Sequence, residues 1–227
     1  MKNIKSRIAS VLYESGLSAN AATALGLLFA GLSGLLIYQG YFFWASVALF
    51  ISGGLDLLDG AIARVSKKAS AFGGILDSSL DRYGDGFVLG GALFFCAARG
   101  KFLYAGLALS AMLGSFLISY VRARAECAIE KCKVGFWERG ERTVYLALGL
   151  LFNNLAVPLW VLGVATHLTA GFRLTYASRP QDPRWGAPSA SWGIRNLLLH
   201  TAGRQSSIYY AKAVILFLAV AFLRLSF

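Results

Sequence analysis

Charged residues are scarce in this chain. Lysine, arginine, aspartate and glutamate make up 15% of its 227 residues, against 57% hydrophobic residues and a mean hydropathy of +0.59. Soluble globular domains carry about 25% charged residues, so this composition excludes an ordinary soluble domain. Histidine and cysteine are also rare, with two and three copies. Neither type shows a metal-ligand pattern, so we assign the histidines no role and expect free, reduced thiols.

The chain contains several long stretches without charged residues. No charged residue occurs from Ser15 to Leu55, which is long enough for two helical spans of about 20 residues each, with a turn at Gln39-Gly40. Four further spans are expected: one over residues 76–98, one over 102–121, and two over 143–172, where Asn153-Asn154 breaks the run. The sequence therefore predicts an all-α, polytopic membrane bundle with a six-helix core.

Both ends of the chain differ from this core. Residues 4–12 place apolar side chains on one helical face opposite basic ones, which predicts a short helix at the membrane interface, with a solvated tail as the alternative. We expect one membrane domain over residues 1–176. Residues 177–227 then form a polar cytoplasmic segment, rich in Pro, Gly, Ser and Arg, and a candidate seventh hydrophobic helix over Ile208–Leu223.

Basic residues outnumber acidic ones, giving a formal net charge of +11. They are spread between the spans rather than gathered on one soluble domain, so we expect no nucleic-acid partner. With the N-terminus in the cytoplasm, only Arg99, Lys101 and Arg224 lie on the outer side, which satisfies the positive-inside rule. The expected location is the cell (inner) membrane, with membrane lipids as neighbours and an anionic substrate at the cytoplasmic face.

Five aspartates interrupt the apolar stretch GGLDLLDGAIARVSKKASAFGGILDSSLDRYGD, residues 53–85. Asp56 and Asp59 are three residues apart and share a helix face; Asp77, Asp81 and Asp85 are four apart and share another. Because a short loop joins the two helices, both faces meet at the same membrane surface.

Interfacial, solvated charges are the simplest interpretation of these aspartates. However, a carboxylate at mid-membrane costs roughly 2.5 to 3.5 kcal/mol, so four would cost on the order of 10 kcal/mol if deep and uncompensated. Carboxylates on two antiparallel helices are the oxygen ligands that Mg²⁺ requires. We therefore predict a cation site. Gly60, Gly73 and Gly74 leave room beside it for a phosphorylated ligand, and Arg64 can pair with a phosphate or an aspartate.

The order Asp56-x-x-Asp59-Gly60-x-x-Ala63-Arg64, then Gly73-x-x-x-Asp77-x-x-x-Asp81, resembles the signature of the CDP-alcohol phosphotransferase (CDP-alcohol phosphatidyltransferase) family in every specified position. The resemblance implies an enzyme with two Mg²⁺ ions, for which Mn²⁺ can substitute, and a homodimer. It implies that Asp56, Asp59, Asp77 and Asp81 hold the metals, with Asp81 also the catalytic base. Asp56, Gly60, Arg64, Gly73 and Asp77 would bind the CDP-lipid.

The acceptor is indicated by a second resemblance. LDSSLDRYGD, SYVRARAE and the E-R-x-E-R run of residues 138–142 resemble stretches of phosphatidylinositol-phosphate synthases, which transfer a phosphatidyl group from CDP-diacylglycerol to inositol 1-phosphate and release CMP. Arg122, Arg139 and Arg142 would then bind the phosphate of a phosphorylated polyol. The alternative is that these arginines only obey the positive-inside rule.

Two other functions stay open at this point. Glycerol 3-phosphate also carries a phosphate, so a phosphatidylglycerophosphate synthase, or another CDP-alcohol phosphotransferase, fits the same signature. Carboxylates in membrane helices also occur in cation-coupled transporters. Against a transporter, the aspartates gather at one membrane face, not at the midplane, and no broken-helix pair is apparent.

Overall fold

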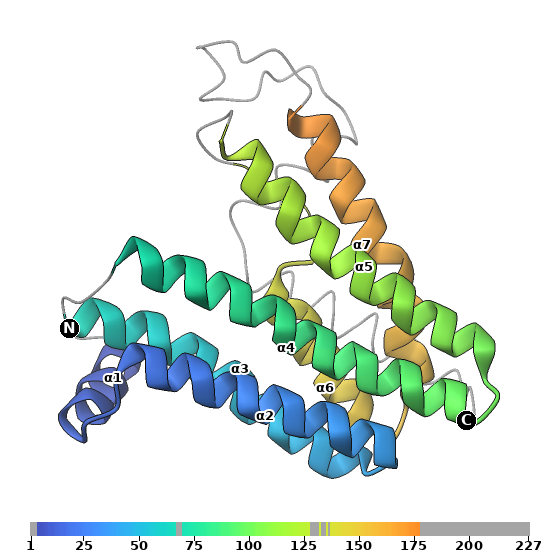
Figure 1. Ribbon diagram of the computed structural model, residues 1–227, viewed down its shortest axis with the longest axis horizontal. Coiled ribbons are helices and arrows are strands. Elements are labelled where there is room, and N and C mark those ends of the chain that lie inside the picture. Colours follow the sequence, from blue (N-terminus) through green and yellow to red (C-terminus); the bar gives the residue numbers. More distant parts are fainter. Residues whose placement is uncertain (1–3, 67–69, 128–131, 133–134, 136, 178–227) are drawn as a thin grey trace.

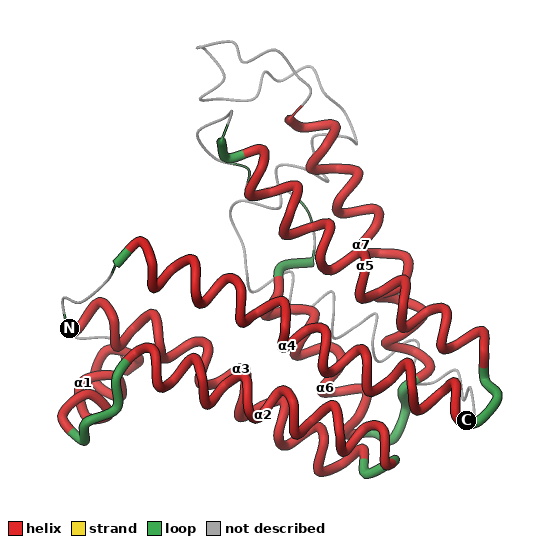
Figure 2. Tube along the Cα trace, viewed as in Figure 1, coloured by secondary structure: helices red, strands yellow, loops and turns green. Residues whose placement is uncertain are grey.

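The structure, a computed structural model, describes residues 4–66, 70–127, 132, 135 and 137–177. Every regular element in these ranges is a helix, which confirms the all-α class (Figure 2). In chain order they are α1 (Ile4–Glu14), α2 (Ala19–Gln39), α3 (Phe42–Val65), α4 (Ala71–Ala98), α5 (Phe102–Ala125), α6 (Arg139–Leu151) and α7 (Ala156–Ala177). The polar segment and the hydrophobic helix that the sequence predicts over residues 177–227 lie outside the described residues, apart from Ala177 at the end of α7.

The first uncharged run folds into α2 and α3, with the turn where the sequence predicts it. Ser18 caps the start of α2 by accepting a hydrogen bond from the Ala21 amide at 3.2 Å. The helix ends at Gly40, which has φ +90°, a left-handed conformation that glycine adopts without strain. The chain then reverses, so the start of α2 and the end of α3 lie at the same end of the bundle.

The helices form two groups (Figure 1). Helix α2 packs along α3 and α4, and α6 packs on α3, whereas α5 pairs with α7 and joins the rest mainly through α4. Small residues permit the close contacts: a Cβ added at Gly34 would collide with the backbone of Phe87, and one at Gly91 with the backbone of Gly34. The Ser52 hydroxyl on α3 donates to the Gly26 carbonyl on α2 at 2.8 Å. Glycine contacts and hydroxyl bonds thus hold the helices where burial of apolar surface cannot.

Four helices, α2, α3, α5 and α7, are long and apolar enough to cross a membrane. Helix α4 has 28 residues but carries the aspartates, and α6 has only 13 residues, about 20 Å at 1.5 Å per residue. Because the hydrocarbon core of a bilayer is about 30 Å thick, α6 is too short for the full crossing that the sequence predicts there. It begins at a capping box of Glu138 and Glu141 and stops before Asn153, which has φ +55°.

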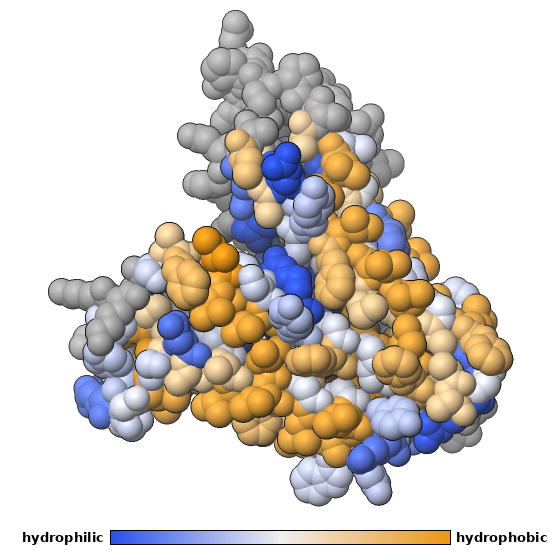
Figure 3. Space-filling model, in the orientation of Figure 1, coloured by the Kyte–Doolittle hydropathy of each residue, from blue (hydrophilic) through white to orange (hydrophobic). Residues whose placement is uncertain are grey.

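Hydrophobic side chains cover most of the outer surface seen in Figure 3, with hydrophilic residues gathered in the upper centre, where the two helix groups diverge. The exposed residues include Leu28, Phe94 and Phe102, which are more than 60% exposed. An apolar exterior of this kind is stable only in lipid. Together with the four spans, it identifies an integral membrane protein.

The predicted N-terminal helix is present as α1. It packs on α3 through Ala9, which is buried in a small cluster with Ala22, Ala61 and Ile62. Ile8 and Val11 remain exposed on its other side. Helix α1 therefore closes the end of the bundle at which α2 starts and α3 finishes, and its exposed apolar residues are available to a membrane surface.

Candidate active site

Three of the predicted metal ligands meet between α3 and α4. Asp56, Asp59 and Asp77 each offer a carboxylate oxygen within 4.8 Å of the others. Asp59 is 6% exposed and is oriented by two donors, the Thr23 hydroxyl at 2.9 Å and the Gly60 amide. One oxygen of Asp77, Oδ1, is buried and accepts no hydrogen bond from the described residues. The two helix faces therefore converge as their spacing predicts.

This donor set fits a hard divalent cation. Oxygen ligands bind Mg²⁺, Mn²⁺ or Ca²⁺ at about 2.0 to 2.6 Å, so ligands on opposite sides of one ion lie about 4 to 5 Å apart. The three carboxylate oxygens lie within 4.8 Å of one another, so they are close enough together to bind one ion. The buried, unbonded Oδ1 of Asp77 also requires a positive partner, because a desolvated carboxylate oxygen is costly when nothing contacts it.

Asp81, the fourth predicted ligand, lies beside this group and is held by an arginine. Arg139 Nη1 is 2.7 Å from Asp81 Oδ1 and also donates to Asp56 Oδ1. Asp85 forms an ion pair with Arg142 at 3.0 Å. The five aspartates thus face three guanidinium groups, because Arg82 also lies 3.8 Å from Asp81, and this leaves a formal excess of two negative charges for cations to neutralise.

Arginines from three other helices form the second part of the site. Arg142 is 5% exposed and its Nη1 donates to the Trp137 carbonyl at 2.9 Å. Arg173, on α7, is 2% exposed and donates to the Ile118 carbonyl of α5 at 2.8 Å. The positive charges of Arg142 and Arg122 act on Arg173. Like charges repel, so an anion that bound among these arginines would offset their repulsion.

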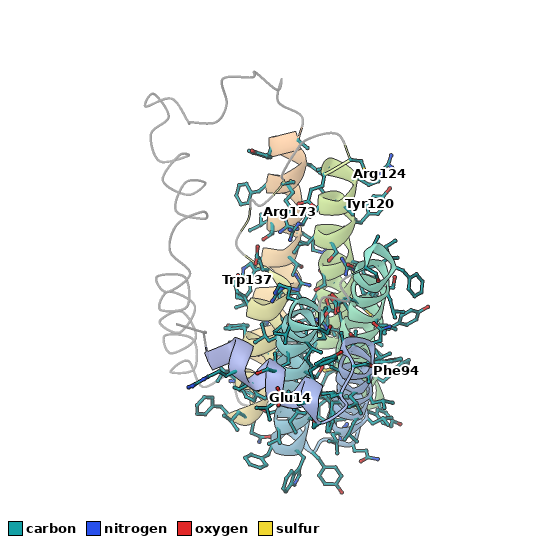
Figure 4. The ribbon with its side chains drawn as sticks, turned by 90° about the vertical axis from the view of Figure 1, so that its left-hand side faces the viewer. Glu14, Phe94, Tyr120, Arg124, Trp137 and Arg173 are labelled. Carbon is teal, nitrogen blue, oxygen red and sulfur yellow. The ribbon has the colours of Figure 1, made fainter. Side chains whose placement is uncertain are left out.

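Arg122, the third predicted phosphate ligand, is the most exposed of these arginines. It forms an i,i+4 ion pair with Glu126 at 3.0 Å, and this hydrogen bond lowers the pKa of the Glu126 carboxyl. Figure 4 shows Arg173 between α7 and α5, whereas Tyr120 and Arg124 project from the opposite side of α5. Arg173 therefore lies on the side of α7 that packs on α5, away from Arg124.

The residues predicted to bind the CDP-lipid lie around the carboxylates. The Arg64 guanidinium covers Gly60, where an added Cβ would lie 3.6 Å from its Nη1. The Gly73 amide donates to the Ser70 hydroxyl at 3.0 Å, which caps the start of α4. A Cβ at Gly74 would meet nothing within 4 Å, so the fold itself does not require glycine there.

A cavity of about 280 Å³ joins the acidic and basic parts. Its charged lining is Asp56, Asp85, Arg139 and Arg142, and its remaining walls are largely apolar residues of α3, α4 and α6, together with Ser52, Ser115 and Thr143. A ligand with one phosphate near Asp56 and another near Arg142 would therefore occupy a continuous space.

Two polar residues of the site were not predicted. Thr23 orients Asp59 from α2, and Arg173 joins the arginines from α7. Their signal was weak: Thr23 follows the start of a span, and Arg173 is a single arginine near the end of one. Both lie at the end of the bundle that holds the aspartates, so helix direction alone would have made them candidates.

An acidic centre next to buried arginines, at one end of a membrane bundle, is suited to an enzyme that transfers a phosphate-bearing group. The comparison with known proteins agrees with this class. The chain belongs to the CDP-alcohol phosphatidyltransferase family, which matches residues 17–175, and is a transferase of phospholipid biosynthesis.

Its relatives include inositol phosphate-lipid synthases. The archaetidylinositol phosphate synthase of Pyrococcus horikoshii is 33% identical over 164 residues, covering 72% of this chain and 85% of that protein. The phosphatidylinositol phosphate synthase of Mycobacteroides abscessus is 32% identical over 180 residues, covering 75% and 82%.

Solved structures of the Mycobacterium tuberculosis phosphatidylinositol phosphate synthase have the same fold. The one with CDP-DAG bound has a TM-score of 0.69 at 31% identity and covers 77% of this chain and 93% of that one. The complex with manganese and citrate has a TM-score of 0.69 at 30% identity, covering 86% and 99%. That neighbour binds manganese, and the carboxylates described above have the chemistry that fits an ion of this kind.

Proposed function

We propose that the chain transfers a phosphatidyl group from CDP-diacylglycerol to inositol 1-phosphate and releases CMP. The observation that carries the proposal is one cavity lined by Asp56 of the carboxylate centre and by two arginines, Arg139 and the buried Arg142. The inositol phosphate-lipid synthases among its relatives favour inositol 1-phosphate over glycerol 3-phosphate as acceptor.

Asp56, Asp59, Asp77 and Asp81 would hold two Mg²⁺ ions, for which Mn²⁺ can substitute. When bound, these ions neutralise the charge of the donor pyrophosphate. Gly60 and Gly73 leave space for that pyrophosphate against the helix backbones, and the Arg64 guanidinium over Gly60 is in reach of its oxygens. Thr23 keeps Asp59 in one orientation by its hydrogen bond.

Asp81 is the proposed base. The acceptor hydroxyl forms a new oxygen–phosphorus bond to the β-phosphorus of CDP-diacylglycerol, and its proton passes to an Asp81 carboxylate oxygen. The bond from that phosphorus to the bridging oxygen breaks, and CMP leaves with the bridging oxygen. Asp81 and Asp56 both adjoin the Arg139 guanidinium, so the base lies beside the group that binds the donor.

The acceptor phosphate is proposed to bind Arg122, Arg139 and Arg142, with Arg173 as a fourth member. Buried guanidinium groups anchored to carbonyls, as Arg142 and Arg173 are, keep their position when an anion enters. The cavity supports this assignment, because Arg139 and Arg142 line it together with Asp56 of the carboxylate centre.

The proposed active site faces the cytoplasm from the cell (inner) membrane, because the ends of α3, α5 and α7 that surround it carry the basic residues of the positive-inside pattern. We further propose residues 1–176 as the catalytic membrane domain, residues 177–227 as a cytoplasmic segment with a hydrophobic helix, and a homodimer as the working unit.

The test is CMP release from CDP-diacylglycerol by the purified chain in detergent, with inositol 1-phosphate and Mg²⁺. Detergent abolishes any gradient, so a cation-coupled transporter would show no reaction there, whereas the proposed transferase turns over. Release that needs both the acceptor and the cation is expected. Acceptor-independent release, or none with any phosphorylated polyol, would exclude the proposal.

A further inference from the structure

Arg139 occupies an unusual position for a residue expected to bind a phosphate. It is the first residue of α6, and its side chain reaches between α3 and α4. One nitrogen, Nη1, forms ion pairs with both Asp56 and Asp81, which are proposed cation ligands. Nε is buried and lies 3.6 Å from Asp85 Oδ1, beyond hydrogen-bond distance. The guanidinium therefore has the place and the charge of a cation bound between two of the carboxylates.

Arg142 differs from Arg139 in how it is held. It donates to Asp85 and also to the Trp137 carbonyl, a fixed backbone group. Every ion pair and hydrogen bond that the described residues give the Arg139 guanidinium is to a carboxylate. Arg142 is therefore fixed by a backbone group, whereas Arg139 is held by carboxylates, which can bind another cation in its place.

A divalent cation bound by Asp56 and Asp81 would lie beside Nη1. Two cations this close in a partly buried site repel each other, and the repulsion from a divalent ion is twice that from a monovalent one. Arg139 and the cation therefore compete for these carboxylates. The space open to the displaced side chain is the cavity of about 280 Å³, which Arg139 lines together with Arg142.

We propose that Arg139 is a transferable counter-ion. It neutralises Asp56 and Asp81 in the cation-free enzyme, leaves them when they take a divalent cation, and then binds the acceptor phosphate beside Arg142. The inference rests on the proposed function and adds an order to it, because the acceptor site is complete only after the cation site is filled. By linkage, cation and acceptor then raise each other's affinity by the same factor.

The test compares Arg139→Gln with Arg82→Gln in the full-length chain. Arg82 provides a matched control, because it carries the same charge 3.8 Å from Asp81 but its side chain is 37% exposed. Two affinities are measured without donor lipid: that for Mn²⁺ alone, by electron paramagnetic resonance, and that for inositol 1-phosphate at saturating Mn²⁺, by calorimetry.

The expected changes have opposite signs. Arg139→Gln should bind Mn²⁺ at least about tenfold more tightly than the wild type, because a competing charge is gone. It should bind inositol 1-phosphate about tenfold to hundredfold more weakly, because a charge-assisted contact is gone. Arg82→Gln should change either affinity by no more than about fivefold. If Arg139→Gln fails to fold, Arg139→Lys, which keeps the charge, should retain the wild-type Mn²⁺ affinity and the coupling between the ligands.

Each other result is decisive as well. If Arg139→Gln leaves the Mn²⁺ affinity unchanged, Arg139 is a phosphate ligand only. If the variant binds Mn²⁺ more tightly but inositol 1-phosphate with unchanged affinity, Arg139 is a fixed counter-ion. Either result overturns the proposal that Arg139 moves from the carboxylates to the acceptor phosphate. If Arg82→Gln changes both affinities as much as Arg139→Gln does, the effect comes from the loss of any nearby positive charge and not from the position of Arg139, which also overturns the proposal. A wild type that binds neither ligand would instead overturn the proposed function.

Discussion

The two halves of the site hold their charges in different ways. In the carboxylate half, Asp56, Asp59 and Asp77 come from two neighbouring helices and place like charges within 4.8 Å. In the arginine half, Arg122, Arg142 and Arg173 come from three helices, and the two buried ones are anchored to backbone carbonyls. The first half thus has the charge and the geometry to take up an external cation, while two arginines of the second are held in place by the fold.

This difference indicates a division of labour. A cation centre needs oxygen ligands that converge on one ion, so clustered carboxylates with an unbonded oxygen are suitable. A phosphate receptor gains affinity when its donors are already in place, so anchored guanidinium groups are suitable. Arg139 and Asp85 lie between the halves and connect them.

Breaking the carboxylate half should have the largest effect. Asp59→Asn preserves size but removes a hard ligand, so CMP release should fall by at least about hundredfold, since a bound metal supplies several kcal/mol to phosphoryl transfer. Similar losses are expected for Asp56→Asn and Asp77→Asn. The assay is CMP release, with the melting temperature as the control for folding. Full turnover of Asp59→Asn in excess EDTA would contradict a metal-dependent reaction.

Breaking the arginine half should have a smaller and more selective effect. Arg142→Ala should raise the KM for inositol 1-phosphate by about tenfold to hundredfold, with little change for CDP-diacylglycerol, because one charge-assisted contact is lost. Steady-state kinetics with each substrate varied in turn measures the change in KM for inositol 1-phosphate and for CDP-diacylglycerol separately.

The same variant also removes a contact of Asp85. The double variant Asp85→Asn/Arg142→Ala separates the two roles, and the acceptor defect should persist in it. A normal KM in the double variant would show that Arg142 only neutralises Asp85. Asp85→Asn alone should leave Mn²⁺ affinity within about fivefold of the wild type, because Asp85 pairs with Arg142 and Arg139 and is not one of the three carboxylates that meet within 4.8 Å.

The close packing of α2 on α4, the helices that carry Thr23 and Asp77, can be tested separately. Gly91→Ala should destabilise the protein by about 1 to 3 kcal/mol, because its Cβ would collide with the Gly34 backbone and force α2 from α4. Gly90→Ala is the matched control, since a Cβ there meets nothing within 4 Å. Thermal unfolding in detergent should show a lower melting temperature for Gly91→Ala alone. Equal melting temperatures would mean that α2 and α4 need no close contact.

The smallest effect is expected at the edge of the arginine half. Glu126→Gln frees Arg122 from its ion pair, so the affinity for inositol 1-phosphate should rise by no more than about fivefold, the range for partly exposed pairs. Calorimetry at low salt is the measurement. A weaker affinity would show that Glu126 positions Arg122 for the phosphate.

The carboxylate half was predictable because its geometry is local. Spacings of three and four residues fix a helix face, and a short loop fixes which ends of two helices meet. The arginine half was only partly predictable. Arg122 and Arg142 stood out at helix ends, but Arg173 contacts the Ile118 carbonyl 55 residues away, and no local pattern encodes that contact.

The fold divides in a similar way. Uncharged runs predicted α2, α3 and α5 well, and Asn153-Asn154 predicted the break between α6 and α7. The length of α6 could not be predicted from hydropathy, because its start is set by a capping box rather than by the loss of apolar residues. The role of Arg139 was hidden for another reason: sequence gives its place at a helix end but not which charges its side chain reaches.

Acceptor choice by the wild type tests the account most directly. CMP release should be measured with inositol 1-phosphate, glycerol 3-phosphate and free inositol at matched CDP-diacylglycerol and Mg²⁺. The account predicts the highest kcat/KM for inositol 1-phosphate and a value at least about tenfold lower for inositol, which cannot use the arginines. If inositol, serine or another alcohol without phosphate proves the best acceptor, the arginine half is not a phosphate receptor and the proposed function is wrong.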